Sequence, residues 1–269
     1  MPQNPAAYGL YLVTSRTNLQ LVRMKYLLEV CAGDIDSVYA ALHGGAGRVE
    51  LCSGLEEGGL TPSYGFIKEA CGIEGLGKHV LIRPRGGDFL YSEREKRLMY
   101  VDIRKALEAG ADGVVIGALK ADGQIDSDFT RACVAEAEGR SVTFHRAFDL
   151  CADPVSSLER LIDAGCDRLL TSGQAATAET GLPLLRELTA RAGDRLSVMP
   201  GCGVNAGNAW NILRGCGARE IHASARKPVT SLMRHRIAGV EMGQAGRDEY
   251  TRLTTSEEAV REIVESFHE

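Results

Sequence analysis

The segment GADGVVI, residues 110–116, decides the fold, because three other parts of the chain repeat its pattern: residues 45–51, 165–170 and 217–222. In each, a glycine follows a helical pattern, a small residue comes next, and a short apolar strand begins after a polar step. A glycine just beyond a helix readily adopts the left-handed conformation that ends it. The four glycines are 65, 55 and 52 residues apart, which is about the length of two strand–helix units.

A further strand is expected midway in each interval, at residues 26–31, 80–83, 142–145 and 196–199. Helical patterns fill the gaps, at residues 35–43, 63–71, 93–109, 128–137, 155–164, 179–192, 206–213 and 256–267. Eight strands that alternate with eight helices predict a single parallel (β/α)8 TIM barrel over residues 24–269. The alternative is an open doubly wound sheet. It calls for a glycine fingerprint after the first strand, where this chain has Cys31-Ala32-Gly33-Asp34.

Composition is that of an ordinary soluble globular protein, with 44% hydrophobic and 25% charged residues. A net charge of −5 gives no reason to expect a nucleic-acid partner, and no apolar run is long enough to suggest a membrane span. Residues 1–23 lack the pattern of a secretory signal and are interpreted as a flexible N-terminal extension. Eight scattered cysteines without a CxxC motif favour reduced thiols and a cytoplasmic location.

Alternation along the strands predicts a polar pocket on the barrel axis, because every second side chain faces that axis. The axial positions hold mainly polar residues: Glu29, Cys31, Arg48, Glu50, Cys52, Arg83, Arg85, Thr143, His145, Glu220, His222 and Ser224. The opposite positions are almost wholly apolar, as a helix-facing layer should be.

We expect catalytic groups at the carboxyl ends of the strands, namely Glu29, Glu50, Arg83, His145 and His222. Arg85, Asp88, Arg146 and Asp149 are expected near the rim, where arginines suit an anionic small molecule and Asp88 can pair with an arginine. The alternative is a structural ion-pair layer that fills the barrel. We favour that interpretation for Arg48 and Glu220, which lie lower in their strands.

The last two strand ends predict a site for a phosphate or carboxylate. Gly201 and Gly203 precede a helix that Asn205 could cap, and Ser224 and Arg226 follow the final strand. Ser172, at another strand end, joins this anion-binding set. No nucleotide or pyridoxal phosphate (PLP) signature is present, and no lysine stands at a strand end to form a Schiff base.

Cys31 and Cys52 end adjacent strands at matching positions, so their thiols could face each other. Three interpretations are open. They can be small core residues, or a soft pair that binds Cu(I) or zinc with His145, His222 or a glutamate as a further ligand. A disulfide is geometrically feasible but is disfavoured in a reducing compartment.

Seven ordered blocks together resemble the copper homeostasis protein CutC family: LLEVC (27–31), RVELCSGLEEGGLTPS (48–63), LIRPRGGDFLYSERE (81–95), VTFHRAFD (142–149), LLTSG (169–173), MPGCGV (199–204) and IHASAR (221–226). The resemblance runs from residue 24 to about residue 243. It implies a (β/α)8 barrel, a cytoplasmic location, a homo-oligomer and a role in copper tolerance with a copper ion as partner. The copper(I) cysteines proposed for the family match Cys31 and Cys52.

Two features depart from the family pattern. Cys202 stands where the family usually has glycine, and the 23-residue leader has no counterpart. Two functional hypotheses follow. One is a copper(I)-binding homeostasis protein, and the other is a barrel enzyme that uses Glu/His acid–base chemistry on a phosphorylated or carboxylated metabolite.

Overall fold

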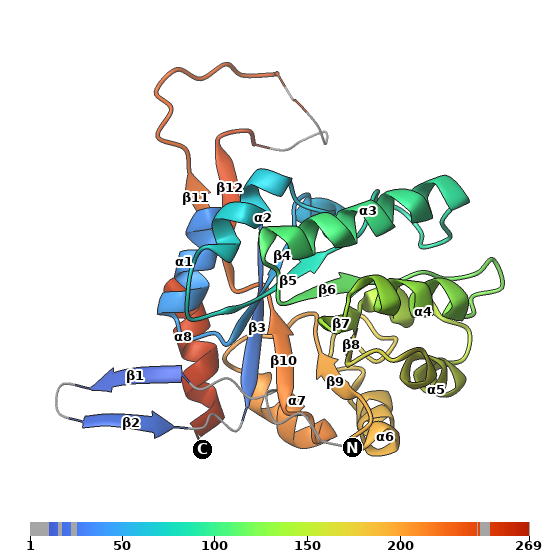
Figure 1. The fold of residues 1–269 in the computed structure, drawn as a ribbon. Helices are drawn as coiled ribbons and strands as arrows, with labels where there is room; N and C mark the ends of the chain where they lie inside the picture. The colour runs from blue at the N-terminus through green and yellow to red at the C-terminus, as the bar shows by residue number, and fades with distance from the viewer. Residues whose placement is uncertain (1–10, 16–17, 23–25, 241, 243–247, 269) are drawn as a thin grey trace.

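Eight parallel strands form the centre of the molecule (Figure 1). The computed structural model describes residues 11–15, 18–22, 26–240, 242 and 248–268. The strands follow the order β10-β3-β4-β5-β6-β7-β8-β9, and a parallel bridge between Gly201 and His222 joins the two ends of that order. Their bounds are β3 Leu27–Ala32, β4 Arg48–Leu51, β5 Gly77–Leu81, β6 Gly113–Ile116, β7 Ser141–Phe144, β8 Arg168–Thr171, β9 Ser197–Pro200 and β10 Glu220–Ala223. The predicted (β/α)8 barrel is confirmed.

Helices connect the strands close to the predicted positions: α1 Ile35–His43, α2 Tyr64–Cys71, α3 Glu93–Ala109, α4 Ser127–Glu136, α5 Pro154–Ala164, α6 Leu182–Ala192, α7 Ala209–Cys216 and α8 Glu257–Glu265. Short 3-10 helices are η1 Leu55–Glu57, η2 Arg146–Leu150 and η3 Ser266–His268. Ser92 and Glu95 cap α3 reciprocally, and Gly110 ends it at φ +108°. These two caps provide hydrogen-bond partners for backbone N–H and C=O groups that have none within the helix.

The predicted cap at Asn205 is wrong. The Asn205 side chain accepts a hydrogen bond from the Gly207 amide at 2.9 Å, and α7 begins only at Ala209. Asn208 accepts a bond from the Asn205 amide at 2.9 Å. The polar residues therefore form a local turn before the helix, an alternative that short amide side chains commonly offer.

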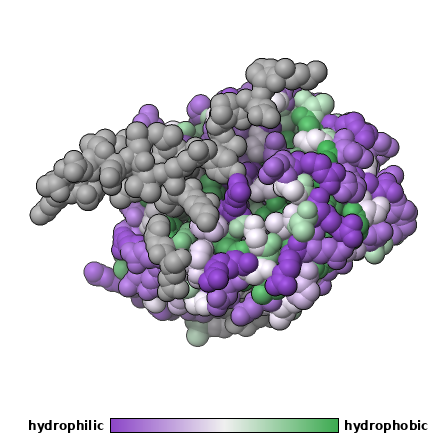
Figure 2. Space-filling model, turned by 90° about the horizontal axis from the view of Figure 1, so that it is seen from below, coloured by the Kyte–Doolittle hydropathy of each residue, from purple (hydrophilic) through white to green (hydrophobic). Residues whose placement is uncertain are grey.

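The apolar core lies between the strands and the helices, as the alternation predicts. Leu28, Val30, Val49, Leu51 and Ile82 are fully buried and belong to one continuous cluster with the inner faces of the helices. Each such side chain contributes about 1.5–3 kcal/mol by leaving water. Figure 2 shows the outside from one end, where hydrophilic side chains surround a smaller number of hydrophobic ones.

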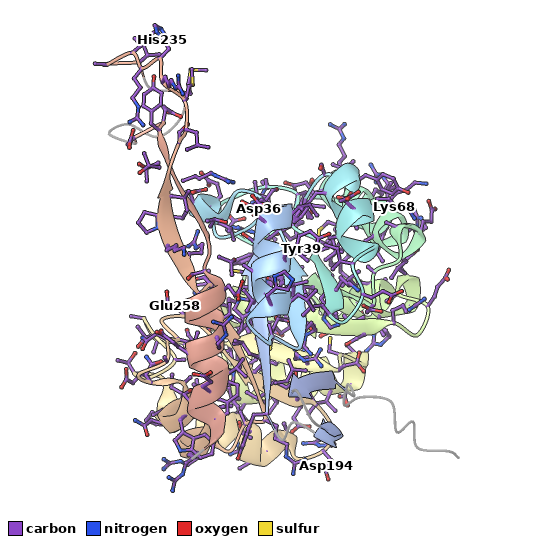
Figure 3. The ribbon with its side chains drawn as sticks, turned by 90° about the vertical axis from the view of Figure 1, so that its left-hand side faces the viewer. Asp36, Tyr39, Lys68, Asp194, His235 and Glu258 are labelled. Atoms are coloured by element: carbon purple, nitrogen blue, oxygen red, sulfur yellow. The ribbon has the colours of Figure 1, made fainter. Side chains whose placement is uncertain are left out.

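Two antiparallel hairpins are additions to the barrel. β1 (Tyr11–Ser15) pairs with β2 (Asn18–Val22) inside the expected N-terminal extension, whose residues 1–10, 16–17 and 23 lie outside the described residues. β11 (Arg226–Thr230) pairs with β12 (Thr251–Thr255) between β10 and α8. This second hairpin and the described residues of its connection project from the barrel, and His235 lies far out among them (Figures 1 and 3). We call residues 226–255 the arm.

Candidate functional site

A layer of paired charges closes the lower part of the barrel. Arg48 pairs with Glu29 and, at 2.5 Å, with Glu220. Arg168 binds the same Glu220 carboxylate at 2.5 and 3.1 Å. Burial opposes ionisation of Glu220, but the charges of Arg48 and Arg168 outweigh it and lower the pKa to about 2. The structural ion-pair layer expected of Arg48 and Glu220 is confirmed.

His222 lies above this layer, between two carboxyl groups. Its Nδ1 is 2.8 Å from Glu29 Oε1, and its Nε2 is 3.9 Å from Glu50 Oε2. Burial alone would lower the pKa of His222, but its hydrogen bonds with Cys31 and Glu29 raise it well above the usual value. Burial also opposes the charge of Glu29, yet Arg48 and His222 hold the pKa of that carboxyl well below its usual range. An imidazolium–carboxylate pair therefore spans β10 and β3.

Cys31 and Cys52 belong to a small buried apolar cluster with Leu81 and Val115. The predicted matching of their positions is wrong, since Cys31 stands opposite Glu50 and Cys52 follows β4, which ends at Leu51. Neighbouring strands of a closed barrel are staggered, which shifts side chains that match by sequence. The thiols nevertheless interact with each other, and both are unbridged.

The two thiols differ in acidity. Interaction with Cys52, reinforced by His222, lowers the pKa of Cys31 well below its usual value despite burial. The same interaction and burial raise the pKa of Cys52 well above its usual value. The surroundings thus favour the anionic form of Cys31 over that of Cys52, whose thiol donates to the Ala32 carbonyl at 3.6 Å.

Glu50 behaves in the opposite way to Glu29. Burial, and then the negative charges of Glu29 and Cys31, raise the pKa of Glu50 to about 8 although His222 opposes the shift. One carboxylate and one carboxylic acid thus lie on adjacent strands. Such a pair of carboxyl groups can serve as base and acid at the same pH.

His145 ends β7 across the barrel from the cysteines. Its Nδ1 accepts a hydrogen bond from the Ala147 amide at 3.1 Å, and its Nε2 is buried without a partner. Burial, assisted by the charge of Arg83, lowers the pKa of His145 to about 3. His145 is therefore a neutral imidazole across the physiological pH range.

Arg83 is buried as predicted, but its guanidinium donates most of its hydrogen bonds to three backbone carbonyls. Nη1 donates to the carbonyls of Glu57 (2.6 Å) and Gly59 (2.8 Å), and Nη2 donates to Gly87 (2.9 Å). The side chain thereby fastens the loops that follow β4 and β5 over the barrel mouth. Its Nε remains buried without a partner.

The prediction that the Arg85 side chain faces the barrel axis is wrong, because its guanidinium points toward α3. It binds Glu95 at 2.6 Å and Asp88 at 3.1 Å, and it also donates to three carbonyls of its own loop. The loop departs from strand geometry after Leu81, where β5 ends, so side-chain alternation no longer applies. The expected pairing of Asp88 with an arginine is confirmed.

Arg146, Asp149 and Ser172 form a network at the end of β8. Asp149 accepts bonds from the Ser172 amide at 3.0 Å and from Arg146 Nε at 2.7 Å, while Arg146 Nη2 donates to the Ser172 hydroxyl at 3.1 Å. The carboxylate of Asp149 is thus saturated by its neighbours. Arg146 remains half exposed at the mouth.

The turn after β9 requires residues that tolerate unusual backbone angles. Cys202 and Gly203 have φ of +85° and +73°, and a Cβ on Gly201 would lie 2.6 Å from Leu170. The backbone at Cys202 is therefore one that glycine adopts more readily. The Cys202 thiol bonds to the carbonyl of Ala176 at 3.2 Å.

Ser224 and Arg226 follow β10. The charge of Arg226 lowers the pKa of both Cys31 and Cys52, although other groups dominate. Arg226 is therefore close enough to the thiols to favour their anionic forms.

The structure thus brings Glu29, Cys31, Glu50, Cys52 and His222 together as one cluster, which we call the thiol–carboxylate cluster. His79, Phe89 and Tyr91 were missed by sequence reasoning. His79 Nδ1 lies 3.9 Å from Glu29, and Phe89 lies 5.0 Å from both Arg83 and His145. The aromatic pair shortly after Arg85 was the available signal for the last two.

Within the described part of the chain, no group of three or more His, Cys, Asp and Glu side chains is arranged to hold a metal ion. No described helix is both long and apolar enough to cross a bilayer.

These features define a closed (β/α)8 barrel whose strand ends carry a thiol–carboxylate cluster. The CutC family model matches residues 26–227, so the chain belongs to the CutC family. It is 51% identical to a family protein CutC of Chromobacterium violaceum over 244 residues, 91% of this chain and 99% of the relative. It is 46% identical over 239 residues to the copper homeostasis protein cutC homolog of Mus musculus, covering 88% of each chain. A crystal structure of a copper homeostasis protein CutC from Streptococcus agalactiae superposes with a TM-score of 0.70 at 34% identity, covering 73% of this chain and 97% of the other.

Proposed function

We propose that this protein is a cytoplasmic copper homeostasis protein that binds Cu(I) through Cys31 and Cys52. The observation that carries the proposal is the burial of Cys31 and Cys52 in one cluster, where the two thiols shift each other's pKa in opposite directions. Soft thiolate ligands select Cu(I) over harder cations. Two thiols alone can hold that ion in linear coordination, so a larger set of ligands is not required.

The charged residues around Cys31 and Cys52 are compatible with a bound copper ion that the protein carries as cargo. His222 interacts with Cys31, and its positive charge favours the anionic form of that thiol. Arg226 offsets part of the negative charge of the two thiolates. Binding would displace the proton of Cys52, because the thiolate is the metal ligand.

An anaerobic Cu(I) titration against a chromophoric chelator tests the proposal. Cys31→Ser/Cys52→Ser should weaken Cu(I) binding by more than about a hundredfold, since both ligands are lost. Cys133→Ser/Cys166→Ser is the matched control, because these buried cysteines lie in the helix-facing core. Equal affinities of the wild type and the Cys31/Cys52 variant would refute the proposal.

A second candidate function is an enzyme that acts on a phosphorylated or carboxylated small metabolite. The opposite pKa shifts of Glu29 and Glu50 favour it, because they supply a base and an acid side by side. The anion would be held at the mouth by Arg146, Ser172, Gly201, Gly203, Ser224 and Arg226. Mass spectrometry of the protein purified under native conditions should find an anionic metabolite, and Glu50→Gln should abolish its turnover. Its absence, or full activity of that variant, would exclude this candidate.

We also propose that the protein is a homo-oligomer that associates through the arm. Leu232 and Met242 on the arm are 97% and 81% exposed, and Met233, Ile237 and Val240 are exposed beside them. Exposed apolar groups gathered on a projecting segment are typical of an interaction surface. The proposed occupant is a second copy of this chain.

A further inference from the structure

Two buried hydrogen-bond donors beside the Phe89 ring have no acceptor. Arg83 and His145 are each only 6% exposed, and Arg83 Nε and His145 Nε2 are both unpartnered. The Arg83 guanidinium carbon and the His145 ring centroid each lie 5.0 Å from the centroid of Phe89. The Tyr91 hydroxyl, which interacts with Arg83, is also buried without a partner. A buried donor without a partner costs about 1–3 kcal/mol, so a further acceptor beside these groups would be favourable.

Local contacts fix the direction of the His145 donor. The Ala147 amide donates to Nδ1, so the proton of the neutral ring is on Nε2. Gly117 packs so closely that a Cβ there would lie 2.3 Å from His145 Cε1. The imidazole edge therefore rests against backbone on one side and presents Nε2–H on the other.

We propose that Arg83 Nε–H and His145 Nε2–H form a subsite for an oxygen atom of a bound carboxylate or carbonyl compound. This inference rests on the second candidate function above and names the class of its ligand. The contacts around Arg83 oppose a phosphate dianion, because the carbonyls of Glu57, Gly59 and Gly87 already surround that guanidinium. Asp149 adds a negative charge near His145.

His145 in this subsite acts as a neutral hydrogen-bond donor. It does not act as the acid or base that the sequence suggested. A neutral imidazole that donates to a carbonyl oxygen polarises it without taking up a proton. The proton transfers would remain with Glu29 and Glu50, whose pKa values differ in the required sense.

Nitrogen-15 NMR of the histidine-labelled full chain tests the proposal, with acetate, pyruvate and inorganic phosphate as probes. Acetate or pyruvate should shift the His145 Nε2–H resonance saturably. His79 is the internal reference, because it is a second buried imidazole with an unpartnered nitrogen, located beside Glu29 on β5. His145→Phe, which keeps a ring but removes the donor, should bind the same probe about tenfold more weakly. His145→Gln, which retains a donor, should bind more tightly than His145→Phe and provides a second variant if the phenylalanine variant does not fold.

The possible results distinguish failure of the Arg83–His145 subsite from failure of the second candidate function. Saturable probe binding that leaves the His145 resonance unmoved overturns the subsite but leaves an anion-binding pocket intact. A response to phosphate alone overturns the carboxylate or carbonyl class. Failure of all three probes to bind counts against both the subsite and the second candidate function.

Discussion

His145 and His222 are both buried imidazoles at the ends of barrel strands, yet their neighbours favour the neutral form of His145 and the protonated form of His222. His222 contacts Glu29 and Cys31, which favour its protonated form, whereas His145 lies near Arg83 and a backbone amide occupies its Nδ1. The sequence places both residues on the barrel axis by alternation. It could not assign their charges, because these depend on partners that come from other strands.

The low pKa of His145 predicts a specific pH dependence of stability. The unfolded chain binds a proton at His145 below about pH 6.5 and the folded chain only below about pH 3, so this contribution to stability is lost as the pH falls between those values. His145→Phe should remove up to about 1.4 kcal/mol per pH unit from the slope of the unfolding free energy in that range. Chemical denaturation over this pH range measures the slope.

Val101→Ala, at a solvent-exposed position on α3, is the control and should keep the wild-type slope because it removes no titratable group. Parallel curves for the wild type and His145→Phe would show that the folded protein protonates His145 as readily as the unfolded chain.

The Arg83 side chain joins the loops after β4 and β5. Ser53 and Leu60 pair across the first loop, and Arg83 joins Glu57 and Gly59 of that loop to Gly87 of the second. A Cβ on Gly59 would lie 3.8 Å from the Cβ of Cys52, so the first loop covers that thiol. The sequence indicated a polar group at this place but could not show that the protein's own carbonyls bind it.

Arg83→Ala should therefore free the loop over Cys52. We expect faster amide hydrogen exchange at Gly59 and Leu60, faster alkylation of Cys52, and a loss of about 1–3 kcal/mol in the free energy of unfolding. Arg85→Ala is the control, because that side chain faces α3. Unchanged exchange and alkylation in Arg83→Ala would show that the loop is held by other contacts.

The barrel was predictable from the sequence because its glycine-ended helices and alternating strands are local features. Gly110, Gly165 and Gly217 end their helices in the left-handed conformation, as the repeated pattern requires. The stagger that offsets Cys31 from Cys52 was not predictable, because closure of the barrel sets it. The arm was also missed, since only β-branched residues such as Val229 and Thr251 indicated strands there.

Disruption of the apolar arm should weaken self-association of the whole molecule. Leu232→Ser/Met242→Ser is expected to shift the protein toward the monomer in sedimentation velocity, because it replaces exposed apolar surface with hydroxyls. Leu98→Ser, at an exposed position on α3, is the control. An unchanged sedimentation profile would exclude the arm as the interface.

X-ray absorption spectroscopy of the Cu(I)-loaded full chain identifies the atoms that bind the copper ion. We expect two sulfur atoms in the first coordination shell of copper, both absent in Cys31→Ser/Cys52→Ser and both retained in Cys133→Ser/Cys166→Ser. A first shell of nitrogen and oxygen alone, or two sulfur ligands that persist in the Cys31/Cys52 variant, would contradict Cu(I) binding through Cys31 and Cys52.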